Sequence, residues 1–162
     1  MPDVKYPKPK LGSLAPDFNA ENQKGETITL KNLLKTGQKV LLIFYPADQT
    51  TGCTTQLCGV RDYYEEYKKA GVAVLGINHA DAVSHQKFID KHNYQFDILI
   101  DTNRMISENY GQLKFMFGHR SIKRGVYLID TDGRVIYTVQ GQQDNQVILD
   151  LLKADKTADK SD

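Results

Sequence analysis

The sequence predicts an α/β protein in which a central mixed β-sheet carries helices on both faces. Apolar runs of strand length alternate with longer amphipathic segments through the middle of the chain. Near the C-terminus, two further strand-like segments flank Thr131-Asp132-Gly133, a strong signal for a hairpin turn. The expected order, β-α-β-α-β followed by β-β-α, combines parallel and antiparallel strands in one sheet.

The first elements lead to a buried central strand. Residues 26–30 are expected to form a short strand, followed by a turn of helix over residues 31–35. Residues 39–45 are apolar nearly throughout, which is typical of a strand covered on both faces.

A long amphipathic helix is expected next, over residues 53–70, with Gly71 as its stop. Residues 72–77 then form a second buried strand. The apolar side chains of the helix recur at helical spacing, with charged residues between them: Leu57, Val60, Tyr64 and Tyr67.

The remaining elements complete the alternation. A helix is expected over residues 82–92, a strand over residues 96–100 and a short helix over residues 105–110. The hairpin strands span residues 125–130 and 134–139, and a final amphipathic helix spans residues 144–153.

The chain has 162 residues, which is enough for one domain with its own core. We place that domain at residues 11–152. Residues 1–10 carry three prolines and three lysines and are expected to form an extended arm. Residues 153–162 are small and charged, and are expected to be a disordered tail.

Composition excludes several classes of function. The formal net charge is +1 and no basic stripe stands out, so nucleic acid is not expected as a partner. No apolar run approaches the ~18–20 residues of a membrane span, and no secretion signal opens the chain. We therefore expect a cytoplasmic protein with no membrane partner.

The chemistry centres on the two cysteines of the chain, Cys53 and Cys58. Cys53 follows a buried strand and a polar turn, where a helix is expected to begin, and free N–H groups there favour a thiolate. An ordinary cysteine, with a pKa of ~8.5, is only about 3% ionised at pH 7. Complete ionisation would therefore speed its reactions about 30-fold, so a fast enzyme also needs donors aimed at the transition state.

Cys58 lies five residues farther along the same expected helix. Ideal helix geometry separates the two Cα atoms by ~8.5 Å, whereas a disulfide needs less than ~7 Å. A bond between the cysteines would require the first helical turns to unwind. Gly52 and Gly59 bracket the segment, and glycine weakens a helix.

Three other interpretations of the cysteines are weaker. A buried hydrophobic role fits poorly with the polar, threonine-rich turn before Cys53. A zinc site requires a second ligand pair at close spacing, which the four histidines do not form. A thioredoxin-type reductase would carry C-x-x-C, whereas the spacing here is C-x₄-C.

The cysteine segment resembles the peroxiredoxin signature P-x-x-x-T-x-x-C, which stands here as Pro46, Thr50 and Cys53. A second cysteine five residues later is similar to the Q-type, or bacterioferritin-comigratory, branch. Further motifs follow in the family's order over residues 12–140: Ala15-Pro16-Asp17-Phe18, Leu42-Ile43-Phe44-Tyr45, Val74-Leu75-Gly76-Ile77, Ser84-His85-x-x-Phe88, Leu99-Ile100-Asp101, Tyr110-Gly111 and Arg124-x-x-Tyr127-Leu128-Ile129-Asp130.

The resemblance implies a thioredoxin-like fold and an antioxidant thiol peroxidase. Cys53 would attack the peroxide and become a sulfenic acid, and Cys58 would resolve it as an intramolecular disulfide. Thr50 would hydrogen-bond the thiolate and the peroxide, Pro46 would shield the sulfur, and Arg124 would supply the transition-state donor.

The resemblance also implies the partners. They would be hydrogen peroxide or an organic hydroperoxide, and thioredoxin or a similar dithiol, with no cofactor and no metal. Intramolecular resolution favours a monomer or a weak homodimer. Two rival functions are a one-cysteine peroxidase, in which Cys58 is incidental, and a redox switch that binds a partner when oxidised.

Some residues depart from the branch or invite other roles. Thr51 replaces its usual proline and Gln56 its usual glutamate, which removes a carboxylate that could pair with the arginine. His85 is expected at a helix surface or cap. Residues 115–118 are unusually apolar for a loop, and fit either the core or a surface for a subunit or reductant.

Overall fold

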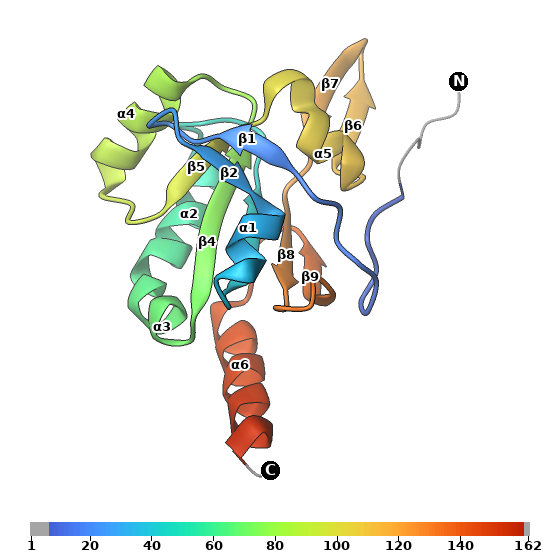
Figure 1. Ribbon diagram of the computed structural model, residues 1–162. Coiled ribbons are helices and arrows are strands. Elements are labelled where there is room, and N and C mark those ends of the chain that lie inside the picture. Colours follow the sequence, from blue (N-terminus) through green and yellow to red (C-terminus); the bar gives the residue numbers. More distant parts are fainter. Residues whose placement is uncertain (1–6, 161–162) are drawn as a thin grey trace.

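The computed structural model describes residues 7–160 and confirms the mixed sheet with helices on both faces (Figure 1). Its five strands lie in the order β5-β4-β3-β8-β9. The central strand β3 runs parallel to β4 and antiparallel to β8. The strands are β3 (Lys39–Phe44), β4 (Val72–Asn78), β5 (Asp97–Ile100), β8 (Gly125–Ile129) and β9 (Val135–Gln140).

Two small antiparallel pairs lie outside this sheet, namely β1 (Asn19–Glu21) with β2 (Thr27–Thr29), and β6 (Leu113–Met116) with β7 (His119–Ile122). The helices are α1 (Leu30–Lys35), α2 (Thr51–Asp62), α3 (Tyr64–Lys69), α4 (Ala82–His92), the 3₁₀ turn η1 (Thr102–Arg104), α5 (Met105–Asn109) and α6 (Asn145–Lys160). Within the described residues, none of them has the length and apolarity to cross a bilayer.

The sheet separates two apolar cores, and β3 supplies both. Because side chains alternate along a strand, Leu41, Ile43 and Tyr45 face one core and Val40, Leu42 and Phe44 face the other. The first core packs against α2, α3, α4 and α6, and the second against α1 and α5. This two-sided burial explains the continuous apolar run that the sequence shows over residues 40–45, all fully buried.

The structure corrects several boundaries. The helix expected over residues 53–70 begins earlier, at Thr51, and is divided at Tyr63 into α2 and α3. The tail expected to be disordered from residue 153 continues α6 to Lys160, and Asp155 forms an ion pair with Lys39 at 3.0 Å.

Three strands were not expected, β1 and the β6–β7 pair. Residues 7–10 of the expected arm have no regular structure, and the rest of that arm lies outside the described residues. Residues 161–162 of the expected tail lie outside them too.

Candidate active site

Cys53 is the third residue of α2, one turn inside the end of the helix where backbone N–H groups are free. The loop that leads to it leaves β3 at Phe44 and passes through Gln49, whose φ of +67° lies in the left-handed region. The Cys53 side chain is fully buried. The structure thus places this thiol at a helix N-terminus, as the sequence predicted, and covers it completely.

Arg124, which just precedes β8, reaches the same turn of α2. Its Nη1 donates a hydrogen bond to the Gln56 Oε1 at 2.9 Å. A Cβ atom placed on Gly52 would lie 2.9 Å from the Arg124 Nη2, so glycine leaves the space that the guanidinium occupies. Since Gly52 precedes Cys53 and Gln56 follows it by one turn, these contacts bring the cation to the turn that carries the thiol.

The charge of Arg124 is not neutralised by a carboxylate. None of the ion pairs between described residues includes Arg124. Gln56 is fully buried, and its Nε2 is a buried donor that has no hydrogen-bond partner among residues 7–160. The arrangement therefore offers two groups that attract an anion at Cys53, the guanidinium and the helix N-terminus.

Thr50 is the N-cap residue of α2, but its side chain makes no capping hydrogen bond. The Thr50 hydroxyl donates instead to the Ala47 carbonyl at 3.1 Å, so in this structure it is not directed to the cysteine sulfur as the resemblance implied. Pro46 lies in the loop two residues beyond the end of β3 and is half-buried. The loop thus brings Pro46, Thr50 and Cys53 into one short segment.

Asp48 fixes this loop to the body of the protein. Its carboxylate accepts hydrogen bonds from the Tyr45 hydroxyl at 2.6 Å and the Ser84 hydroxyl at 2.7 Å. The same carboxylate lies 2.7 Å from the His85 Nδ1. The other ring nitrogen of His85 faces the carbonyls of Asn78 and Leu99, both at 3.2 Å. Both ring nitrogens of His85 thus lie within hydrogen-bond distance of oxygen atoms.

This network corrects the expectation that His85 lies at a helix surface or cap. The His85 side chain is fully buried and joins α4 to the active-site loop. Burial acts to raise the pKa of Asp48, but hydrogen bonds from His85, Tyr45 and Ser84 outweigh it, and the pKa is lowered. Burial, reinforced by Asp48, raises the pKa of Tyr45 well above its usual value, so this hydroxyl remains a donor.

Cys58 lies in the middle of α2, so both cysteines belong to one intact helix and both are free thiols. The Cys58 sulfur lies 3.5 Å from the Tyr94 hydroxyl. Burial and the contact with Cys58 raise the pKa of Tyr94. Tyr94 is therefore a neutral phenol at physiological pH and can donate to the sulfur.

Two side chains at the start of α6 hold the middle of α2, one from the residue pair just before the helix and one from its first residue. Gln143 donates to the Gln56 carbonyl at 3.1 Å, and Asn145 donates to the Gly59 carbonyl at 3.3 Å. With the Asp48 network upstream, α2 is fastened on both sides of Cys53. Sequence reasoning missed Asp48, Tyr94, Gln143 and Asn145 because their roles depend on contacts between distant segments.

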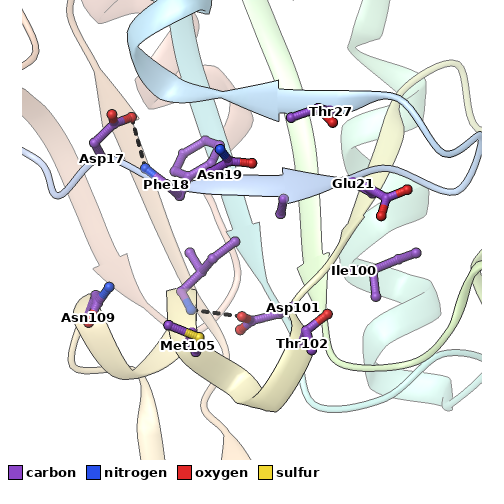
Figure 2. Close-up of a pocket in the computed structure, with 12 residues that line it drawn as sticks. Asp17, Phe18, Asn19, Glu21, Thr27, Ile100, Asp101, Thr102, Met105 and Asn109 are labelled. Atoms are coloured by element: carbon purple, nitrogen blue, oxygen red, sulfur yellow. Dashed lines mark hydrogen bonds between the residues drawn. The ribbon is translucent and has the colours of Figure 1, made fainter.

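A separate pocket of about 460 Å³ lies between β1 and α5 and contains neither cysteine (Figure 2). Two of its three acidic side chains, Asp17 and Asp101, already have partners. Asp17 accepts a hydrogen bond from the Phe18 N–H at 2.9 Å, and Asp101 accepts one from the Ile106 N–H at 2.7 Å (Figure 2). We assign no chemistry to this pocket, and the cysteine turn stands as the candidate active site.

Comparison with known proteins places this geometry in context. The sequence model that describes the AhpC/TSA family matches residues 11–138 of this chain. The chain is 41% identical over 128 residues to a putative peroxiredoxin bcp of Coxiella burnetii, a match that covers 76% of this chain and 83% of that protein. It is 40% identical over 135 residues to the chloroplastic peroxiredoxin Q of Triticum aestivum, and there the match covers 83% of this chain but only 61% of the relative.

Solved structures of proteins with similar names also superpose on this chain. The peroxidoxin BcpB of Mycobacterium tuberculosis superposes with a TM-score of 0.82 at 27% identity, covering 90% of this chain and 97% of that one. The bacterioferritin comigratory protein of Xanthomonas campestris superposes with a TM-score of 0.75 at 25% identity, covering 85% and 90%. These likenesses agree with a thioredoxin-like arrangement of the sheet and helices.

Proposed function

Because this chain belongs to the AhpC/TSA family of peroxiredoxins, we propose that it is a thiol-dependent peroxidase that acts through Cys53. The observation that carries the proposal is the position of Arg124, which donates to Gln56 and occupies the space that a side chain at position 52 would fill, on either side of this cysteine. A cation and a helix N-terminus stabilise a thiolate and can also stabilise the charge that develops on a peroxide oxygen.

In the first step, the Cys53 thiolate attacks one oxygen of the peroxide. The S–O bond forms as the O–O bond breaks, and the departing oxygen takes up a proton to become water or an alcohol. Cys53 is left as a sulfenic acid, and Arg124 donates to the oxygens during the transfer. The substrates would be hydrogen peroxide and organic hydroperoxides. Alkyl peroxide reduction activity is described for the bacterioferritin comigratory protein of X. campestris, and it supports this substrate class.

In the second step, the Cys58 thiolate attacks the sulfur of the sulfenic acid. The S–S bond forms and hydroxide leaves, taking up a proton to become water. Both cysteines lie in α2, so its first turns must unwind before the two sulfurs can meet. A dithiol such as thioredoxin then reduces the disulfide and restores both thiols. Pro46 and Thr50 would shield and orient the reacting groups.

The test measures NADPH consumption with thioredoxin, thioredoxin reductase and hydrogen peroxide, for the wild type, Cys53→Ser and Cys58→Ser. We expect sustained turnover in the wild type and none in Cys53→Ser. Cys58→Ser should consume about one equivalent of peroxide and then stop. Equal turnover in the wild type and Cys58→Ser would instead support a one-cysteine peroxidase.

Free thiols are counted after one equivalent of peroxide as an independent measurement. None should remain in the wild type. Residual turnover in Cys53→Ser above a few percent would overturn the assignment. A wild type that reacts once and slowly, without turnover with any dithiol, would favour a redox switch.

A further inference from the structure

The β6–β7 hairpin carries large apolar side chains that the fold leaves exposed. Phe115 is 64% exposed, and Phe117, at the turn, is 91% exposed. At the other end of the hairpin, Ile122 is buried and Leu113 packs against the second core. The hairpin is therefore fixed at its base while its tip projects from the molecule beside α5 (Figure 1). This excludes the core as the role of Phe115 and Phe117.

The same segment concentrates positive charge. Residues 111–124 contain four lysine and arginine side chains and no acidic one, and since the whole chain carries +1, the rest of it carries −3. Lys114 is exposed near the tip, and Arg120 lies across the strand pair from Phe115. Two exposed aromatic rings thus stand among cations on one protruding hairpin.

A basic residue from the other end of the chain joins this surface. Lys8 interacts with Lys123 at the base of the hairpin. Burial and the nearby Lys8 lower the pKa of Lys123. Like charges gathered in this way repel one another in the free protein, and an anionic partner would relieve that repulsion.

The shape and the charge of the β6–β7 hairpin favour some classes of binding partner over others. A second copy of this chain, placed across a twofold axis, would bring one basic hairpin against another. A stable protein interface buries about 800 Å² on each partner, which favours broad matched surfaces over a narrow projecting tip. A bilayer requires no matched shape, because aromatic rings enter the boundary of the headgroups while nearby cations meet the lipid phosphates.

We propose that the β6–β7 hairpin docks the protein on anionic lipid bilayers, with Phe115 and Phe117 inserted and Lys8, Lys114 and Lys123 on the phosphates. Such docking needs no membrane span, but it departs from our expectation that the protein has no membrane partner. The hairpin leads directly into Arg124. If the proposed function holds, docking would bring the peroxidase site to hydroperoxides formed on membrane lipids.

The test is cosedimentation of the reduced protein with phosphatidylcholine vesicles, with and without phosphatidylglycerol. We expect binding only to the anionic vesicles, and weaker binding in concentrated salt. Phe115→Ser with Phe117→Ser, and separately Lys114→Gln with Lys123→Gln, should each lower the partition coefficient at least about tenfold. The matched control, Val83→Ser with Val147→Ser, removes side chains 62% and 51% exposed on other elements and should bind like the wild type.

All variants should keep the wild-type melting temperature, since every altered side chain is exposed except that of Lys123, which is half-buried. A wild type that does not sediment with anionic vesicles would overturn the proposal, as would equal binding by the phenylalanine variant. If the phenylalanine variant binds vesicles normally but has a raised KM for a protein dithiol, the partner of the hairpin is an acidic protein and not a bilayer. Binding is measured without peroxide, so its outcome is independent of the peroxidase test.

Discussion

Arg124 is held beside the helical turn that carries Cys53 by an uncharged partner, since its Nη1 donates to the Oε1 of Gln56 at 2.9 Å. A carboxylate at this position would make the same hydrogen bond but would cancel the charge of the guanidinium. The amide positions Arg124 and leaves its charge available to a thiolate.

Replacing Gln56 by glutamate should therefore slow the reaction of Cys53 with peroxide by about tenfold. Thiolate absorbance near 240 nm should appear at higher pH than in the wild type. Stopped-flow kinetics and a pH titration measure the two effects. Gln56→Leu is the control, because it removes the acceptor without adding charge. An equal shift of the titration in both variants would show that position, and not charge, is the cause.

Gly52→Ala should separate folding from activity. Alanine favours a helix by up to about 1 kcal/mol over glycine, so stability should be unchanged or higher. The new Cβ would lie 2.9 Å from the Arg124 Nη2 and would displace this flexible side chain. We expect peroxide reduction to slow about tenfold while the melting temperature does not fall. Gly59→Ala, whose Cβ would lie 3.4 Å from the Gln143 Nε2 and away from Arg124, is the matched control for the peroxide step.

Asp48→Asn should destabilise the protein in a pH-dependent way. Its lowered folded-state pKa means that Asp48 stabilises the fold above its ordinary pKa of 3.8, and that this stabilisation disappears as the pH falls through the lower folded value. Loss of the charged acceptor shared by Tyr45, Ser84 and His85 should cost about 2 kcal/mol at pH 7. Urea unfolding at several pH values should show the wild type and the variant converging in acid. A constant difference from pH 7 to acid would refute the role of the carboxylate, and Asp132→Asn, in an exposed turn, serves as the control.

Tyr94→Phe should slow the resolving step and leave the peroxide step unchanged. The Tyr94 hydroxyl lies 3.5 Å from the Cys58 sulfur, and its raised pKa keeps it a donor that can favour the Cys58 thiolate. Sulfenic acid should persist longer, so mass spectrometry should find more Cys53 sulfinic acid at high peroxide. Tyr64→Phe, on the neighbouring helix, is the control, and an unchanged yield of sulfinic acid in Tyr94→Phe would remove Tyr94 from the mechanism.

Local pattern was sufficient to predict the sheet and the position of the thiol. The apolar run of β3 and the turn around Gly133 carry their signals within a few residues, and α4 was predicted with its observed ends. The β6–β7 hairpin was missed because its turn places Phe117 and Gly118 at positive φ, and phenylalanine is not a turn signal.

Other features depend on tertiary contacts that no local pattern records. No glycine or proline marks the break between α2 and α3 at Tyr63. His85 has the spacing of a helical residue, but its burial follows from the carboxylate of Asp48 in a distant loop. The pairing of Arg124 with Gln56 links segments 68 residues apart, so the sequence could name both residues but could not establish their contact.

Phe44 pairs with Gly125 across β3 and β8, and this register determines whether the parts of the candidate site meet. The loop toward Cys53 leaves β3 just after Phe44, and Arg124 just precedes Gly125, so the alignment of two strands sets the two halves of the reaction centre side by side. A shift of one residue would turn the arginine to the opposite face of the sheet. Such a misaligned chain could remain compact and still be inert. The proposed peroxidase activity would therefore report correct folding in this protein more sensitively than compactness or helix content.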